Sequence, residues 1–307
     1  MFSQPKRRAS FRLANGIHTL LGDRRTSSRL VCGIHTLLGD KPLIMGILNI
    51  TPDSFSDGGK YSGLDAAMQQ VKLMLSEGVD IIDIGGESTR PGSDPVAAGE
   101  QIRRVVPVIA AVRRQLSGDI LISIDTTLSE VAKAALDAGA DIINDISGGR
   151  ADAAILALAA QTGVPIILMH SQETPKTMQD NPYYENVVQE VLGALKASIN
   201  AALKAGIKKE NIAIDPGIGF AKRKQDNIDL LAHLDALVAT GFPVLLGTSR
   251  KRFMGTICDV TEPSELVTAT AVTTALGVMA GVQMFRVHDV KENRQAVDVA
   301  WAIKQSG

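Results

Sequence analysis

The segment LIMGILNITPDSFSDGG, residues 43–59, joins two kinds of sequence. Residues 43–48 are apolar throughout, as in a strand that is buried on both faces. From Asn49 onward the residues are those of turns, such as Thr, Pro, Asp, Ser and Gly. One aromatic residue, Phe55, lies within this polar part, where loops seldom need one. The segment therefore predicts a buried strand that leads into a functional loop.

The same succession of an apolar run and a polar turn recurs along the chain. Strands are expected at 43–48, 79–84, 120–124, 141–143, 164–169, 211–214, 243–247 and 282–287. Amphipathic helices are expected at 64–77, 95–116, 129–138, 151–162, 185–205, 225–239, 264–280 and 291–304. Near-continuous apolar strands indicate a parallel sheet, and eight strand–helix units favour a (β/α)₈ TIM barrel. A doubly wound open sheet is the alternative that this pattern leaves open.

A duplicated segment precedes the first expected strand. RLANGIHTLLGD at 12–23 recurs as RLVCGIHTLLGD at 29–40, with ten of twelve positions identical. Two copies do not make a solenoid, which needs at least three stacked units. We expect residues 1–28 to be a flexible tail, because no apolar run of a signal peptide follows the basic start. Residues 29–307 are expected to be a single domain, in which the second copy forms an N-terminal β-hairpin that closes one end of the barrel.

The composition excludes several classes of protein. A formal net charge of −1 over 307 residues creates no general field that would attract nucleic acid or an anionic membrane. Two cysteines are too few for a disulfide scaffold and fit a reducing cytoplasm. No apolar run reaches the ~18 residues of a membrane span. The chain is therefore expected to be cytoplasmic and to act on small molecules.

Polar side chains follow nearly every expected strand. In a (β/α)₈ barrel the active site forms at the carboxyl ends of the strands. The residues expected there are Asn49, Thr89, Arg90, Asp125, Asn144, Asp145, His170, Asp215, Ser249, Arg250, Lys251, Arg286 and His288. Burying so many polar groups at one mouth is costly unless a ligand, or the groups themselves, compensate. Each residue alone has an ordinary explanation, such as a helix N-cap at Asp145.

The acceptors and the cations at this mouth point to different ligand groups. Asp125, Asn144 and Asp215 suit a flat heterocycle that offers several N–H donors, such as a pterin or a guanine, and spacing alone does not choose between them. The runs SRKR at 249–252 and RVHDV at 286–290 follow the last two strands, where phosphate sites of such barrels often lie. A solvated basic turn is the alternative for either run by itself.

Eight motifs, one after each expected strand, resemble those of the dihydropteroate synthases. In chain order they are GILNITPDSFSDGG, ESTRPG, SIDT, NDISGG, LMH, DPGIGF, GTSRK and RVHDV, and the resemblance covers residues 43 to about 305. It implies a cytoplasmic, usually homodimeric transferase of folate biosynthesis. Such an enzyme joins 6-hydroxymethyl-7,8-dihydropterin diphosphate to p-aminobenzoate with Mg²⁺ present, and releases 7,8-dihydropteroate and diphosphate. The resemblance leaves open whether the chain is a sulfonamide target or a sulfonamide-insensitive variant.

The resemblance also assigns residues to roles. The pterin pocket would comprise Asp125, Asn144, Met169, Asp215 and Lys251. The diphosphate would be bound by Asn49, Arg286 and His288, with Asn49 also at the metal. The p-aminobenzoate site and the loops around it would comprise Phe55, Asp57, Thr89, Arg90, Pro91, Phe220, Lys251, Ser249 and Arg252. Catalysis would depend on Lys251, Asp125, Arg286 and His288.

Two positions depart from the family pattern. Arg252 stands where many relatives have a small hydroxyl residue near the p-aminobenzoate carboxylate, so this contact is open. Glu173 stands where a Gly is common, which leaves the conformation of the fifth loop open. The loop after Asn49 is expected to close over the mouth, with Phe55 against p-aminobenzoate.

The residues also bear on the mechanism. We expect no Ser–His or Cys–His pair that would act as an activated nucleophile, so the resemblance leads to an S_N1-like displacement of diphosphate. Two rival functions are a pterin-binding methyltransferase domain, which does not need Lys251, Arg286 or His288, and a non-catalytic pterin-binding barrel.

Overall fold

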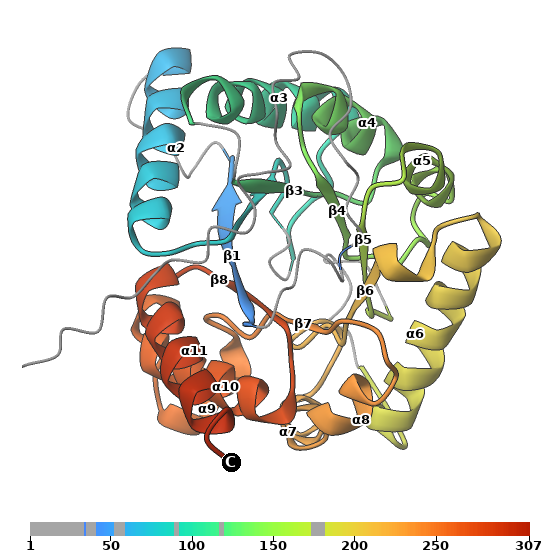
Figure 1. Cartoon of the computed structure of the whole chain (residues 1–307), viewed down its shortest axis with the longest axis vertical. Coiled ribbons are helices and arrows are strands. Elements are labelled where there is room, and N and C mark those ends of the chain that lie inside the picture. The colour runs from blue at the N-terminus through green and yellow to red at the C-terminus, as the bar shows by residue number, and fades with distance from the viewer. Residues whose placement is uncertain (1–33, 35–40, 52–58, 89–91, 117–119, 173–181) are drawn as a thin grey trace, which may run out of the picture. The chain divides into compact units, whose positions relative to one another are not determined.

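The structure is a computed structural model that describes residues 34, 41–51, 59–88, 92–116, 120–172 and 182–307 (Figure 1). Eight parallel strands form one sheet in the order β6-β5-β4-β3-β2-β1-β8-β7. Their bounds are β1 Leu43–Asn49, β2 Ile81–Gly85, β3 Leu121–Asp125, β4 Ile142–Asp145, β5 Ile166–Met169, β6 Ile212–Asp215, β7 Leu245–Leu246 and β8 Met284–Val287. A parallel bridge between Ile214 and Val244 joins β6 to β7. The sheet is therefore a closed barrel, and the expected (β/α)₈ fold is confirmed.

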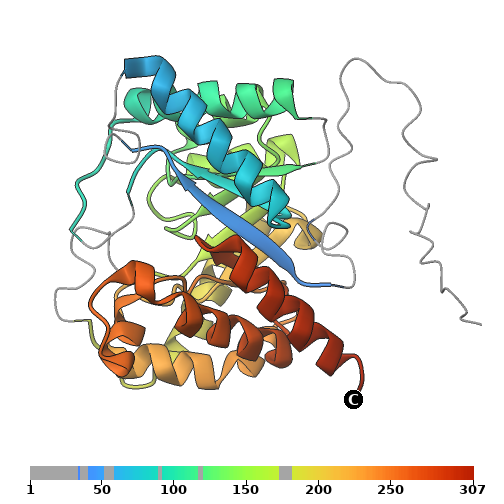
Figure 2. The ribbon, with the colours of Figure 1, turned by 90° about the vertical axis from the view of Figure 1, so that its left-hand side faces the viewer.

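Helices surround the strands in a ring (Figure 1). They are α2 Gly59–Ser76, α3 Ala98–Gln115, α4 Ser129–Ala138, α5 Ala154–Thr162, α6 Val187–Lys204, α7 Lys224–Ala232, α8 Leu234–Val238, α9 Arg252–Cys258, α10 Val267–Ala280 and α11 Val290–Lys304. Figure 2 shows α2 and α11 on either side of β1, and both helices pack against it. No helix within the described ranges has the length and apolar character needed to cross a membrane.

Two expected helices differ from those of the structure. The single helix expected at 225–239 is divided into α7 and α8, which meet at His233. The helix expected at 264–280 begins as a 3₁₀ turn, Pro263–Glu265, and α10 starts only at Val267. The short helix α9, directly after the basic run, had no counterpart among the expected helices.

The barrel interior has an apolar floor and a polar mouth. The floor is a cluster of Met45, Ile81, Ile142, Ile167, Ala213, Leu245 and Met284. Because side chains alternate along a strand, the residue two positions further on points into the same interior. Those residues include Asp83, Asn144, Met169, Asp215 and Arg286. The inward-pointing side chains of these strands thus change from apolar at the floor to mostly polar at the carboxyl end.

Ile34 belongs to the floor cluster. It is 1% exposed, and it is the only residue of the second GIHTLLGD copy that the described ranges include. The described residues all lie in one compact unit, Cys32–Gly307. The expected N-terminal β-hairpin and the tail of residues 1–28 lie outside the described residues and stay predictions.

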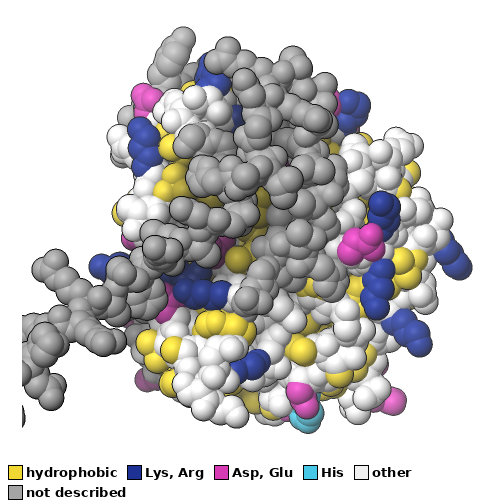
Figure 3. Space-filling model, in the orientation of Figure 1, with side chains coloured by type: hydrophobic (Ala, Val, Ile, Leu, Met, Phe, Trp, Pro, Cys, Tyr) yellow, Lys and Arg dark blue, Asp and Glu magenta, His cyan; other side chains and the backbone are white. Residues whose placement is uncertain are grey.

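The charged side chains of the described residues are mixed in sign. On the face shown in Figure 3, Lys and Arg side chains are interspersed with Asp and Glu side chains along the right-hand side. This mixture agrees with the formal net charge of −1.

Candidate active site

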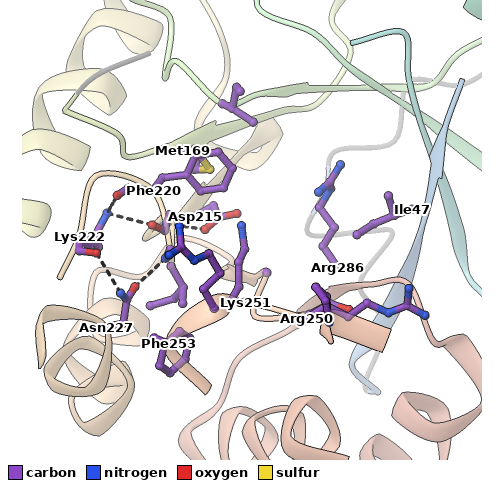
Figure 4. A pocket seen from close by; sticks show the side chains of 18 of the residues that line it. Ile47, Met169, Asp215, Phe220, Lys222, Asn227, Arg250, Lys251, Phe253 and Arg286 are labelled. Carbon is purple, nitrogen blue, oxygen red and sulfur yellow. Dashed lines mark hydrogen bonds between the residues drawn. The ribbon is translucent and has the colours of Figure 1, made fainter. Parts of the chain in front are cut away.

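A cavity of about 740 Å³ lies at the carboxyl ends of the strands (Figure 4). It brings together residues from strands and loops that are far apart in sequence. Of the residues expected at the site, those that line it are Asn49, Asn144, Met169, Asp215, Phe220, Ser249, Arg250, Lys251, Arg252, Arg286 and His288. Asp125 does not line the cavity directly but contacts Arg286, which does. The expected residues Phe55, Asp57, Thr89, Arg90 and Pro91, and also Glu173, lie outside the described residues.

Arg286 is held between two buried carboxylates. Its Nε donates to Asp83 Oδ2 at 2.7 Å, and its Nη2 donates to Asp125 Oδ2 at 2.6 Å. Asn144 Nδ2 also donates to Asp83 Oδ2, at 3.3 Å. Burial alone would lower the pKa of Arg286, but Asp83 and Asp125 raise it above its ordinary value. The guanidinium is therefore a permanent cation in a fixed orientation.

The two carboxyls expected to recognise the heterocycle have raised pKa values. Burial raises the pKa of Asp125 to about 7, although the Arg286 charge opposes the shift. Burial raises the pKa of Asp215 to about 6, against the N–H of Gly217 and the charges of Lys251 and Arg286. A ligand that donates N–H groups to these carboxyls would favour their ionised forms. Perturbed carboxyls that meet in a cavity are typical of an active site.

One wall of the cavity is formed by Phe220, Met169 and Lys251. Phe220 and Met169 belong to one small apolar cluster. The Lys251 ammonium lies 4.0 Å from the centroid of the Phe220 ring, within the range of a cation–π contact. Figure 4 shows Lys251 rising towards Asp215 and Phe220, with Arg286 on the other side of the cavity. Burial, and next the Arg286 charge, lower the pKa of Lys251 to about 8.

The basic run 249–252 does not act as one cluster. Arg250 donates from Nε to Asp289 at 3.0 Å and from Nη2 at 2.5 Å, and it points away from Lys251 in Figure 4. Arg252 is exposed and begins α9 at the cavity. The expectation that all three cations would face a phosphate is therefore too broad, because one is paired with the loop after β8.

Ser249 and His288 form a hydrogen-bonded pair. Ser249 Oγ lies 3.0 Å from His288 Nδ1, and it accepts the backbone N–H of His288 at 3.1 Å. The expectation that no Ser–His pair would act as an activated nucleophile did not foresee this contact, which forms because the loops after β7 and β8 are neighbours. If the hydroxyl donates to Nδ1, the ring carries its proton on Nε2 and can donate it to an anion. With Oγ joined both to the ring and to the backbone N–H of His288, the contact fixes the orientation of the imidazole.

Asp145 has a structural role, but it is not the helix N-cap that was the alternative for it, because the N-cap of α5 is Ala153. Its Oδ1 accepts from the N–H and the hydroxyl of Ser147 at 2.8 and 2.7 Å, and its Oδ2 accepts from the N–H of Gly149 at 2.6 Å. These bonds build the turn after β4, and Asp145 is not among the cavity residues.

Comparisons with known proteins agree with this site. Residues 45–288 match the family of pterin binding enzymes. The dihydropteroate synthase of Synechocystis is 48% identical to this chain over 260 residues, which are 85% of this chain and 89% of that protein.

The chain belongs to the dihydropteroate synthase family.

Solved structures of the family have the same fold. The dihydropteroate synthase of Clostridium difficile, solved in the presence of pteroic acid, has a TM-score of 0.81 and 43% identity, and the match covers 86% of this chain and 97% of that one. The Yersinia pestis dihydropteroate synthase, solved as a complex with a sulfonamide drug, has a TM-score of 0.81 and 42% identity, over 86% of this chain and 95% of that one.

Two buried residues at or near this site were given no role from the sequence. Asp83 lies within the apolar run IIDIG, and its charge within that run was the only sequence feature that could have indicated a role. Lys222 lies in AKRKQDN, which has the appearance of an exposed basic turn, yet its side chain is buried beside His170. Among the described residues, no group of three or more His, Cys, Asp or Glu side chains is placed to hold a metal ion.

Proposed function

We propose that the chain condenses 6-hydroxymethyl-7,8-dihydropterin diphosphate with p-aminobenzoate, giving 7,8-dihydropteroate and diphosphate in folate biosynthesis. The observation that carries this proposal is that one cavity joins three kinds of surface. Asn144 and Asp215 offer acceptors for a heterocycle, Phe220 with Lys251 offers an aromatic wall beside a cation, and Arg286 with His288 offers donors for an anion. A pterin, an aryl amine and a diphosphate need these three surfaces in one space.

The acceptors recognise the pterin. Asp215 and Asn144 face the cavity, and their oxygens match the N–H edge of a pterin ring. Met169 packs beside Phe220 and supplies the apolar surface on which a flat ring lies. Asp125 does not line the cavity and contributes to the site by accepting a hydrogen bond from Arg286.

The donors bind the leaving group. A guanidinium has five N–H donors, and the bonds to Asp83 and Asp125 engage Nε and Nη2 of Arg286. In the proposal the remaining Arg286 donors, together with His288, bind the diphosphate and stabilise its growing charge.

Magnesium fits this donor set. Mg²⁺ is commonly bound by one or two protein oxygens together with substrate phosphates and water, and Asn49 supplies such an oxygen at the end of β1. When bound, the ion neutralises part of the charge of the diphosphate. Removing divalent ions with a chelator should abolish turnover, and adding Mg²⁺ should restore it.

The reaction is proposed to be an S_N1-like displacement. The bond between the pterin methylene and the diphosphate oxygen breaks first, and the electron pair leaves with the diphosphate. The amine nitrogen of p-aminobenzoate then forms the new C–N bond and loses a proton. Incubating the enzyme and Mg²⁺ with the pterin diphosphate alone tests this order: diphosphate release with a water-trapped pterin supports it, and strict dependence on the amine contradicts it.

An assay with both substrates tests the function itself. We expect the wild-type chain to form dihydropteroate. We expect Lys251→Ala to lower kcat by about 10²-fold or more. A pterin-binding methyltransferase domain would give no product from these substrates. A non-catalytic barrel would bind the pterin without turnover. Repeating the assay with a sulfonamide tests whether such a drug competes with p-aminobenzoate at the Phe220 wall.

The proposal includes a homodimer that forms through α10 and α11. α10 contains no charged residue, although it lies on the outside of the barrel (Figure 1). The side chains of Val272, Leu276 and Met279 are exposed along one of its faces. Val299 and Ile303 are exposed on α11, which packs against α10. An apolar face on an outer helix is typical of an interface between subunits. Sedimentation should give a dimer, and Leu276→Glu should give a monomer; a monomeric wild type would contradict this part.

A cytoplasmic location is also part of the proposal. It rests on the small number of cysteines, of which Cys258 is free and exposed. Cell fractionation tests it.

A further inference from the structure

A buried lysine beside Phe220, which also lines the cavity, has no role in the reaction proposed above. Lys222 lies in the loop 217–222 between β6 and α7, and it is only 3% exposed. Its neighbours in the basic run, Arg223 and Lys224, are exposed. Figure 4 shows the Lys222 side chain directed towards the backbone of its own loop, beside Phe220.

The Lys222 ammonium has three hydrogen-bond partners. Its Nζ donates to Gly217 O at 2.9 Å and to Phe220 O at 3.0 Å, and it lies 3.0 Å from His170 Nδ1. Burial, and next the Lys222 charge, lower the pKa of His170 to about 3, so the ring is neutral and Nδ1 accepts. An ammonium has three donors, and all three are therefore used.

These partners are all neutral, which makes the lysine unusual. A buried cation is normally paired with a carboxylate, because an ion pair offsets part of the cost of leaving water. The charges of Asp215 and Asp226 favour the ammonium, whereas those of Lys251 and Arg150 oppose it. Burial outweighs the favourable terms and lowers the pKa of Lys222 to about 7. An apolar side chain would avoid this cost but would leave the carbonyls of Gly217 and Phe220 without this donor, so the lysine is kept for the bonds it makes to the loop.

The loop that Lys222 holds is also fixed from its outer side. Gly219 N–H donates to Asn227 Oδ1 at 2.6 Å, and the Tyr184 hydroxyl donates to Ala221 O at 2.9 Å. Lys222 is the group that binds the carbonyl of Phe220 itself. Through His170 it also ties this carbonyl to the end of β5, where Met169 forms part of the same wall.

We infer that Lys222 is a positioning residue for the aryl amine substrate: with His170 it fixes the loop 217–222, and so sets the Phe220 ring at its distance from the Lys251 ammonium. The inference rests on the proposed function. The proposed aryl amine site lies beside this pair, so a small displacement of Phe220 weakens its binding. The pterin acceptor Asn144 lies on β4, which pairs with β3 and β5 and, among the described residues, has no hydrogen bond to the loop. Asp215 lies on β6, which pairs with β5, although its Oδ1 also accepts the N–H of Gly217 at 2.7 Å.

Steady-state kinetics of Lys222→Met test the inference, with Lys196→Met as the matched control. Lys196 is an exposed lysine on α6. We expect Lys222→Met to raise the KM for p-aminobenzoate about tenfold or more, and to change the KM for the pterin diphosphate less than about threefold. Lys222→Arg keeps a cation and should recover part of the loss. Lys196→Met should match the wild type.

Other outcomes separate this inference from the proposed function. An unchanged KM for p-aminobenzoate, or an equal loss for both substrates, would overturn the role of Lys222 while leaving the proposed function intact. A wild-type chain that forms no dihydropteroate would overturn the proposed function first. Should Lys222→Met not fold, His170→Leu removes one of the three bonds and should raise the KM for p-aminobenzoate alone by about threefold.

Discussion

At the scale of single residues, Asp83 decides how Arg286 is presented to the cavity. It is fully buried, and its Oδ2 accepts from both Arg286 and Asn144. It therefore links a group proposed to bind diphosphate to a group proposed to bind the pterin. Its other oxygen, Oδ1, has no partner among the described residues, so the carboxylate depends on Arg286 for its compensation.

Replacing Asp83 by Asn should damage both activity and stability. The amide keeps the size of the side chain but leaves Arg286 with one fewer carboxylate, and breaking a buried ion pair costs about 3–5 kcal/mol. We expect kcat/KM for the pterin diphosphate to fall about tenfold or more, because the guanidinium loses its fixed orientation. Steady-state kinetics and chemical unfolding check this. Asp137→Asn is the control, because its bond to Lys133 is exposed on α4 and contributes about 0–1 kcal/mol. An unaffected Asp83→Asn enzyme would show that Asp125 alone positions Arg286.

The pH dependence of the reaction follows from three shifted groups. The raised pKa values of Asp215, about 6, and Asp125, about 7, mean that protonation removes their acceptor function as the pH falls below these values. The lowered pKa of Lys251, about 8, means that its charge is lost as the pH rises above it. We expect kcat/KM for the pterin diphosphate to be bell-shaped, with its maximum between about pH 7 and 8. Lys251→Arg should lose the basic limb, since a guanidinium stays protonated. A flat profile from pH 5 to 9 would contradict the assigned roles.

Single residues also show where sequence reasoning reaches its limit. Lys251 and Arg286 were placed correctly at the cavity, because each follows a strand whose direction the apolar pattern predicts. Arg250 was not separated from Lys251, because its partner Asp289 is 39 residues further along the chain. Lys222 was missed because burial of a loop residue depends on what packs over it, and a local run of cations contains no sign of that.

At the scale of elements, the strands were more predictable than the helices. The alternation of buried and polar residues along a strand places apolar Ile142 in the floor and Asn144 at the mouth, and this follows from the period of two alone. The division between α7 and α8 has no such signal. α7 ends at His233, whose Nδ1 lies 2.8 Å from Asp229 O, one helical turn earlier. The Ala- and Leu-rich sequence pattern continues past His233 without a break.

The close approach of the loops after β5 and β6 makes Gly217 irreplaceable. Its φ is +66°, a left-handed conformation, and a Cβ there would lie 1.9 Å from His170 O. Gly217→Ala should therefore lose at least about 3 kcal/mol of unfolding free energy, through backbone strain and overlap together. Gly193→Ala is the opposite case, because Gly193 lies in α6 with nothing within 4 Å of its added Cβ. That variant should gain about 0.5–1 kcal/mol. Thermal unfolding of both variants checks the pair, and equal effects would contradict the packing described here.

At the scale of the whole molecule, the number and spacing of the apolar runs were enough to predict the barrel. Eight parallel strands with helices between them have few other ways to be buried on both faces. The closure itself was not predictable, because it depends on one bridge, between Ile214 and Val244, where β7 is only two residues long. The floor of the barrel consists mostly of strand residues, and it also contains Ile34 from outside the strands.

The duplicated segment provides its own control for the role of Ile34. The copies at 12–23 and 29–40 share the sequence GIHTLLGD, so Ile17 and Ile34 have identical neighbours in sequence. Ile34 packs among the floor residues Met45, Ile81 and Met284, and removing its side chain beyond Cβ would leave a cavity there. We expect Ile34→Ala to cost about 2–4 kcal/mol of unfolding free energy, and Ile17→Ala to stay within about 0.5 kcal/mol of the wild type. Deletion of residues 1–23 should leave kcat and both KM values unchanged, because the catalytic motifs all follow the second copy. If Ile17→Ala is as destabilising as Ile34→Ala, the first copy also packs in the native fold, and the tail is then a structural part of the domain.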